Sequence, residues 1–172
     1  MLILVSGGAG SGKSEYAEQL LLSVGTEPRV YLATMKILDD EDRARVLRHR
    51  TMRRGKGFKT IEALEKLEQV SLPPNCTALL ECLSNLCANE CFGPEGFSNA
   101  EARIWNGLMH LESQADLLVI VTNELFSDGI DYAEETVRYL TVLANLNRRL
   151  AQRADRVYEV VCGIPILWKG KP

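Results

Sequence analysis

The chain has 172 residues, 46% hydrophobic and 25% charged, a composition typical of a globular protein, and we expect one catalytic domain spanning residues 1–172. Its formal net charge of −3 gives no reason to expect nucleic acid or an anionic membrane as a partner. No apolar run has the length of a membrane span, and residues 1–5 lack the basic leader of a signal peptide, so we expect a cytoplasmic protein.

The N-terminal segment predicts a nucleotide-binding loop. Residues 2–6 form an apolar run typical of a buried parallel strand, and residues 15–22 have a helical pattern. Between them stands a complete G-x-x-x-x-G-K-[ST] motif, which in this setting is typical of a loop that binds a nucleoside triphosphate. We expect Lys13 to contact the β and γ phosphates and Ser14 to bind Mg²⁺. The segment that we expect to surround the phosphates comprises Gly7, Gly8, Ala9, Gly10, Ser11, Gly12, Lys13 and Ser14.

The remaining segments alternate between strand and helix patterns. Strands are predicted at residues 29–34, 58–61, 77–81 and 116–122, and helices at residues 43–53, 62–70, 83–92, 99–114 and 132–154. Two last strands, 156–162 and 164–168, are so close in sequence that they must pair antiparallel. The alternation predicts an α/β fold like that of P-loop NTPases: a mostly parallel sheet with helices on both faces and a C-terminal antiparallel hairpin at its edge.

Two predicted strands end in polar residues. Glu81 ends an apolar strand, at a position that suits a carboxylate holding Mg²⁺ through water, although it could instead cap the next helix. Thr122, Asn123 and Glu124 end another strand at the same edge of the predicted sheet. These three residues either support a substrate or metal, or simply close the strand.

The predicted helix at 43–53 is strongly basic and contains one of the two histidines. Arg45, His49 and Arg53 recur every four residues and therefore share a face of the helix. Neighbouring guanidinium groups would lower the pKa of the imidazole, keep it nucleophilic and hold phosphate oxygens. The same pattern is equally compatible with a solvated basic face. The second histidine, His110, stands in an ordinary amphipathic pattern and is expected to be structural.

The cysteines do not predict a metal site. They are Cys76, Cys82, Cys87, Cys91 and Cys162, and the central spacing C-x₄-C-x₃-C fits neither a zinc ribbon nor a redox pair. We therefore expect packed thiols in a reducing cytosol and no metal cluster.

Several blocks of the sequence, taken in order, resemble one enzyme family. The blocks are residues 5–14, 31–34, 37–41, 45–53, 59–62, 79–82, 121–124 and 161–165. Together they resemble the bifunctional adenosylcobinamide kinase / adenosylcobinamide-phosphate guanylyltransferases of cobalamin synthesis, over nearly the whole chain. The resemblance implies that adenosylcobinamide is phosphorylated by ATP or GTP, and that GMP is then transferred from GTP to give adenosylcobinamide-GDP.

The resemblance also implies roles for individual residues. His49 becomes the nucleophile that takes GMP from GTP, and Lys13 serves the triphosphate in both steps. Further nucleotide contacts fall on Ala33, Thr34, Met35, Arg50, Thr51, Met52, Arg53, Glu62 and Glu81. Mg²⁺ would lie near Ser14 and Glu81, and the protein would be a homotrimer with sites near subunit boundaries. Residues 125–131 depart from the glycine- and proline-containing loop of the family, so cobinamide affinity or the kinase step would differ if that loop holds the corrinoid.

Two other functions remain open from the residues alone. In a simple P-loop kinase for a small molecule, His49 would be only a phosphate contact. In a nucleic-acid-dependent ATPase module, the basic helix would grip a phosphate backbone, but the acidic net charge and the lack of stacking aromatic residues on that helix argue against it.

Overall fold

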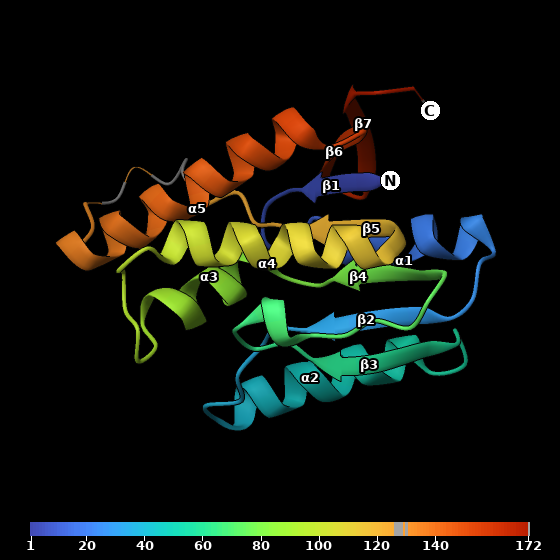
Figure 1. Cartoon of the computed structure of the whole chain (residues 1–172), viewed down its shortest axis with the longest axis horizontal. Coiled ribbons are helices and arrows are strands. Elements are labelled where there is room, and N and C mark those ends of the chain that lie inside the picture. Colours follow the sequence, from blue (N-terminus) through green and yellow to red (C-terminus); the bar gives the residue numbers. More distant parts are fainter. Residues whose placement is uncertain (126–128, 130, 172) are drawn as a thin grey trace.

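The computed structural model describes residues 1–125, 129 and 131–171 and contains a seven-stranded sheet in the order β3-β2-β4-β5-β1-β6-β7 (Figure 1). Strands β1 to β6 are mutually parallel, and β7 pairs antiparallel with β6 at one edge. The α/β fold with a C-terminal antiparallel edge hairpin is thus confirmed. The strands are β1 (Leu2–Ser6), β2 (Arg29–Ala33), β3 (Phe58–Glu62), β4 (Cys76–Leu80), β5 (Ala115–Val121), β6 (Arg156–Val161) and β7 (Ile164–Lys169).

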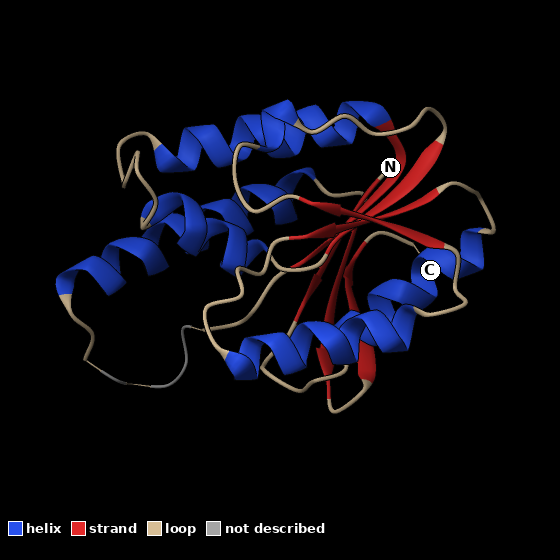
Figure 2. Cartoon of the chain, turned by 90° about the horizontal axis from the view of Figure 1, so that it is seen from below, coloured by secondary structure: helices blue, strands red, loops and turns tan. Residues whose placement is uncertain are grey.

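Helices cover both faces of the sheet, as Figure 2 shows. They are α1 (Lys13–Val24), α2 (Asp40–Arg53), the short 3₁₀ helix η1 (Leu67–Gln69), α3 (Leu83–Cys91), α4 (Ala100–Gln114) and α5 (Glu134–Arg153). Successive side chains of a strand point to opposite faces. Accordingly, Leu2 and Leu4 of β1 join a core that includes residues of α3, α4 and α5, whereas Ile3 and Val5 join a core with residues of α1.

One predicted helix, at residues 62–70, is wrong. Strand β3 continues to Glu62, and only Leu67–Gln69 forms a 3₁₀ turn. Lys66 has a left-handed φ of 54°, and its backbone N–H donates to Glu90 Oε1 at 2.7 Å. Leu67 packs so closely on Gly107 of α4 that a Cβ on the glycine would lie 2.6 Å from Leu67 Cβ. Contacts with α3 and α4 therefore override the local helical pattern.

The region between β5 and α5 is described only in part. The irregular segment expected at 126–130 lies outside the described residues except for Gly129, and so does most of the divergent segment 125–131. The last long helix begins at Glu134, two residues later than expected. Within the described part of the chain, none of the helices combines the length and hydropathy needed to cross a bilayer.

Candidate active site

The phosphate-binding motif forms the turn between β1 and α1. Lys13, the first residue of α1, is almost fully buried, and its Nζ donates to the Gly8 carbonyl at 2.8 Å. Gly12 caps the helix with a left-handed φ of 89°. Burial lowers the pKa of Lys13, because an ammonium group loses hydration there. The loop therefore presents a helix N-terminus and a poorly solvated lysine, a combination that favours binding of an anion.

The hairpin of β6 and β7 supports this loop from a distant part of the sequence. The Gly163 backbone N–H donates to the Ser11 carbonyl at 2.8 Å. A Cβ on Gly12 would lie 3.3 Å from Gly163 Cα, and one on Gly7 would lie 2.6 Å from the Val160 carbonyl oxygen. Glycine is therefore required at both loop positions for close backbone packing as well as for left-handed geometry at Gly12.

His49 projects from the second half of α2 and meets Glu81, the residue that follows β4. Nδ1 of His49 contacts Glu81 Oε1. Burial, together with the nearby Glu18 carboxylate, raises the pKa of Glu81 to about 7. The sequence predicted arginine neighbours for the histidine, and the structure adds a contact with Glu81, which the sequence had indicated only as a residue for Mg²⁺ or the nucleotide.

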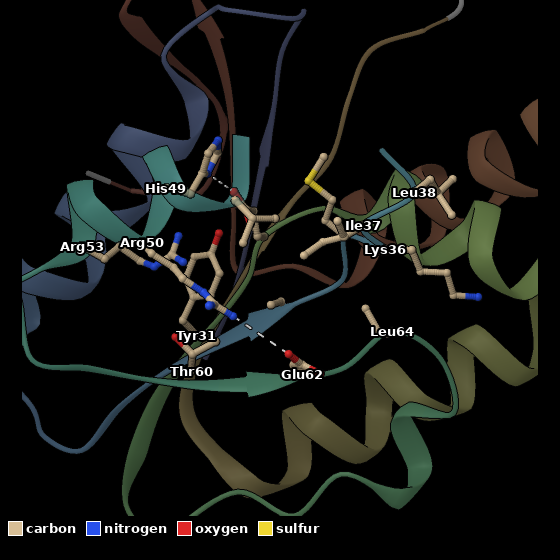
Figure 3. A pocket seen from close by; sticks show the side chains of 14 residues that line it. Tyr31, Lys36, Ile37, Leu38, His49, Arg50, Arg53, Thr60, Glu62 and Leu64 are labelled. Carbon is tan, nitrogen blue, oxygen red and sulfur yellow. Dashed lines mark ion pairs between the residues drawn. The ribbon is translucent and has the colours of Figure 1, made fainter. Parts of the chain in front are cut away.

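Two cavities meet at this pair. The first, here called the loop cavity, has a volume of about 500 Å³ and is lined by residues 9–15 with Glu18, Met35, Arg48, His49, Glu81, Cys82 and Asn123. The second, the side cavity, has a volume of about 370 Å³ and is lined by residues of β2, β3 and α2 and by the segment that joins β2 to α2 (Figure 3). Met35, His49 and Glu81 line both cavities.

The side cavity combines apolar walls with charged groups. Figure 3 shows Arg50 and Arg53 of α2 near Tyr31, and Arg50 Nη2 lies 4.0 Å from Glu62 Oε1. The Arg53 guanidinium stacks on the Tyr31 ring, 3.3 Å from its centroid, and burial lowers the pKa of Arg53. Among the described residues, neither Arg53 Nη1 nor the Tyr31 hydroxyl has a hydrogen-bond partner, although both atoms are buried. Buried polar atoms without partners are costly, so a ligand that supplied hydrogen bonds here would be favoured.

Most of the expected site residues line these cavities. The loop cavity contains Ala9, Gly10, Ser11, Gly12, Lys13, Ser14, Met35, His49 and Glu81, and the side cavity contains Ala33, Met35, His49, Arg50, Arg53, Glu62 and Glu81. Four expected residues stand apart from both walls: Gly7, Gly8, Thr34 and Thr51. Thr34 is buried and its hydroxyl donates to the Cys82 carbonyl at 2.9 Å, whereas the Thr51 hydroxyl donates to the Leu47 carbonyl at 2.9 Å. The side chains of Arg45 and Met52 lie outside the described part of the structure.

The polar residues after β5 have divided roles. The Thr122 hydroxyl donates to Asn147 Oδ1 of α5 at 2.8 Å, which is a structural contact. Asn123 lies at the wall of the loop cavity, where its Nδ2 donates to Ser84 Oγ at 2.6 Å. Glu18, which the sequence did not single out, also lines this cavity and accepts a hydrogen bond from Lys56 Nζ at 2.6 Å. In the sequence, Glu18 could have been noticed as a carboxylate in the middle of a helix that packs against the sheet.

His110 and most of the cysteines line neither cavity, whereas Cys82 lies at the wall of the loop cavity. His110 Nε2 bonds to the Val70 carbonyl at 3.1 Å, which agrees with a structural role. Cys87 and Cys91 are buried with their sulfur atoms 3.9 Å apart. The described residues contain no group of three or more His, Cys, Asp or Glu side chains that could hold a metal ion by themselves.

Comparison with known proteins agrees with the geometry. The model of the family described as cobinamide kinase / cobinamide phosphate guanyltransferase matches residues 3–167. The chain belongs to this family. Among curated members, it is 33% identical to the bifunctional adenosylcobalamin biosynthesis protein CobU of Salmonella typhimurium, over 96% of this chain and 98% of that protein. It is 31% identical to the protein of the same name from Escherichia coli, with the same coverage.

The fold has more distant structural relatives. The solved structure of the flagellar accessory protein FlaH from Methanocaldococcus jannaschii superposes with a TM-score of 0.50 at 12% sequence identity, covering 99% of this chain and 78% of that chain. At such low identity, the likeness concerns the P-loop NTPase fold alone.

Proposed function

We propose that this protein is one catalytic domain that phosphorylates adenosylcobinamide with ATP or GTP and then transfers GMP from GTP to the new phosphate. The products of the second step are adenosylcobinamide-GDP and pyrophosphate. The family match over residues 3–167 supports both reactions. The observation that carries the proposal is the position of His49 on the wall shared by the loop cavity and the side cavity.

This position suits a nucleotide that lies across both cavities. The phosphate loop would bind the β and γ phosphates, and the apolar side cavity would take the base. The α phosphate would then come close to His49. The Glu62 carboxylate in the side cavity is a suitable acceptor for the N–H groups of guanine. Arg50 and Arg53 would bind phosphate or ribose oxygens, and Arg53 Nη1 would gain a hydrogen-bond partner.

The guanylyl transfer would proceed in two displacements at phosphorus. An imidazole nitrogen of His49 attacks the α phosphorus, an N–P bond forms, and the bond to the bridging oxygen breaks with departure of pyrophosphate. The cobinamide phosphate then attacks the same phosphorus and releases the imidazole. A covalent intermediate divides one difficult transfer into two easier steps. Lys13 neutralises charge on the triphosphate in this reaction and in the kinase step.

The residues present fit the Mg²⁺ ion that such reactions use. The Ser14 hydroxyl and the Glu81 carboxylate line the same cavity as Lys13, and both offer the oxygen ligands that Mg²⁺ prefers. Mg²⁺ commonly takes one or two protein ligands and completes its shell with water and substrate phosphates. We therefore assign Ser14 and Glu81 as the groups that would hold it, and its chemistry is to neutralise phosphate charge.

We further propose that the protein works in the cytoplasm as a homotrimer. All five cysteines are free thiols, which supports a reducing compartment. The trimer is implied by the resemblance of the sequence to the family. An exposed apolar row on the edge strand β7, formed by Ile164, Ile166 and Trp168, supports an interface between copies.

Labelling with GTP tests the histidine route. We expect GTP labelled at its α phosphate to tag the protein and release pyrophosphate without cobinamide. In a covalent route, His49 itself accepts the GMP, so that this first step needs no cobinamide phosphate. The linkage should be labile in acid and stable in base, as for a phosphoramidate. His49→Ala should lose the tag and the guanylyl transfer and keep measurable phosphorylation of adenosylcobinamide. His110→Ala is the matched control and should be tagged like the wild type.

Two outcomes would contradict this route. A base-labile tag would point to an acyl phosphate, and a tag that persists in His49→Ala would place the nucleophile elsewhere. A protein that phosphorylates adenosylcobinamide but is never tagged would be a simple kinase, with His49 only a phosphate contact.

A further inference from the structure

We propose that Glu81 is a positioning residue for His49: its carboxylate holds the Nδ1–H of the imidazole, so that Nε2 is the nitrogen that attacks the α phosphorus. The inference rests on the proposed role of His49 in guanylyl transfer. It assigns to Glu81 a task that differs from holding Mg²⁺ or contacting the nucleotide.

The geometry makes Glu81 the rigid member of the pair. It directly follows β4, a strand whose five residues are all buried, and its backbone N–H donates to the Leu32 carbonyl of β2 at 3.2 Å. The Glu81 side chain is 16% exposed, against 31% for that of His49. The backbone of Glu81 is therefore fixed to the sheet beside β2, whereas the imidazole extends from α2 to meet its carboxylate.

The surrounding charges favour pairing of this carboxylate with the imidazole. The other buried acid of the loop cavity, Glu18, already accepts a hydrogen bond from Lys56 at 2.6 Å. The carboxylate of Glu62 lies near Arg50, at 4.0 Å. Glu81 contacts His49 Nδ1, and both residues line both cavities. Because Nδ1 faces Glu81, Nε2 is the ring nitrogen on the side away from the carboxylate.

The contact matters because the two imidazole nitrogens compete. In a neutral imidazole, one nitrogen carries the proton and the other carries the lone pair, and the hydrogen bond at one determines the state of the other. A carboxylate at Nδ1 keeps the proton there and leaves the lone pair on Nε2. When the Nε2–P bond forms and pyrophosphate leaves with the electron pair of the broken P–O bond, the ring becomes positive. The carboxylate then offsets that charge, and the Nδ1 proton stays in the hydrogen bond throughout.

The experiment begins with the ring itself, in the absence of nucleotide. The chain has two histidines, so ¹⁵N-histidine labelling gives a simple NMR spectrum, which His110→Ala assigns. In the wild type, at a pH where the ring is neutral and the Glu81 side chain is ionised, we expect the His49 signal of the Nδ1–H tautomer. Glu81→Ala should shift it toward the Nε2–H tautomer. Glu81→Gln, whose amide oxygen still accepts a hydrogen bond, should largely keep the wild-type tautomer.

The rate of tagging by α-labelled GTP is then measured at saturating GTP and increasing Mg²⁺. Loss of the group that orients a metal-binding histidine typically costs about 10- to 100-fold. By analogy, we expect a loss of this size in Glu81→Ala that persists at saturating Mg²⁺. Glu81→Gln should recover part of the loss. The matched control is Glu65→Gln. The Glu65 carboxylate lines neither cavity, although it lies 3.6 Å from Lys36 at the wall of the side cavity, and this variant should tag like the wild type. The bond in the tagged protein should be to Nε2.

Three results would overturn the inference. These are an unchanged His49 tautomer in Glu81→Ala, a tag on Nδ1, or a tagging rate that saturating Mg²⁺ restores to the wild-type value. The last result would make Glu81 a metal ligand only. A cooperative melting transition and an unchanged His110 signal show that each variant is folded. Failure of the proposed function itself looks different, because then the wild type acquires no tag.

Discussion

At the scale of single residues, the site is built from charges that folding alone would disfavour. Lys13, Arg53 and Glu81 are all largely buried. Burial lowers the pKa of Lys13 and of Arg53 and raises that of Glu81, which in each case favours the neutral form. Removing a charged group from water costs free energy unless another group compensates. A triphosphate would compensate the two cations, and a protonated or metal-bound partner would compensate the carboxylate. Burial of these charges therefore lowers the stability of the free protein and at the same time organises the site before the nucleotide arrives.

The buried carboxylate gives a prediction for stability. The folded-state pKa of Glu81 is about 7, above its ordinary value of 4.5. Because the folded state retains the proton longer than the unfolded state, stability falls as the pH rises from 4.5 toward 7 and stays reduced above 7. Such a shift corresponds to about 3 kcal/mol at most. Glu81→Gln should therefore melt higher than the wild type at pH 8, by several degrees, and gain much less at pH 5.

Thermal melting without nucleotide or Mg²⁺ at both pH values makes the measurement. Glu65→Gln is again the control, since this partly exposed carboxylate pairs with Lys36 at the surface, and its difference from the wild type should not depend on pH in this way. A gain for Glu81→Gln that is equal at pH 5 and pH 8 would show that the carboxylate is not penalised by its surroundings.

At the scale of elements, the sequence predicted correctly the segments whose conformation depends on residues close to them in the chain. Strand β1, the phosphate loop and α1 follow one another directly, so hydrophobic pattern, glycine and helix start all lie within residues 2–24. The segment 62–70 was predicted wrongly because its conformation depends on Glu90 of α3 and Gly107 of α4, far away in the sequence.

The site was predictable residue by residue but not as an arrangement. The helix spacing identified His49, the end of a strand identified Glu81, and the family resemblance added to both, but with unrelated roles. Their contact joins α2 to the residue that follows β4, two segments far apart in the sequence, and no periodicity encodes it. For the same reason, the side cavity and the burial of Thr34 were not foreseen.

The contact between the phosphate loop and the β6–β7 hairpin gives a prediction at this scale. Gly12→Ala forces alanine into a left-handed φ, which costs about 1–2 kcal/mol, and brings its Cβ against Gly163 Cα. We expect a fall in melting temperature of roughly 3–8 °C together with weaker binding of GTP. Gly8→Ala is the comparison for stability, because a Cβ there meets nothing within 4 Å. Equal melting temperatures for the two variants would mean that the hairpin does not constrain the loop.

At the scale of the whole molecule, one edge of the sheet exposes apolar side chains. β7 is the last strand of the sheet, and the alternate side chains Ile164, Ile166 and Trp168 are 65%, 40% and 67% exposed. Leu167, on the opposite side of the strand, packs against the core shared with α1. An exposed apolar edge strand is a template for pairing with another chain unless it is covered. The turn before β7 also bonds to the phosphate loop, so protection of this edge would be coupled to the site.

The proposed homotrimer can therefore be tested at Ile164. A lysine there places a charge in the apolar row without disturbing the core, and unpaired edge strands in monomers commonly carry lysine for this reason. We expect light scattering on a sizing column to give the mass of three chains for the wild type and of one chain for Ile164→Lys. Val24→Lys, at the exposed end of α1, removes a similar apolar surface elsewhere and should stay trimeric.

Since the resemblance puts the sites near subunit boundaries, the monomeric variant should also be tagged more slowly by GTP, although its melting curve remains cooperative. A wild-type protein that runs as a monomer would refute the trimer, and an Ile164→Lys protein that remains trimeric would move the interface to another face.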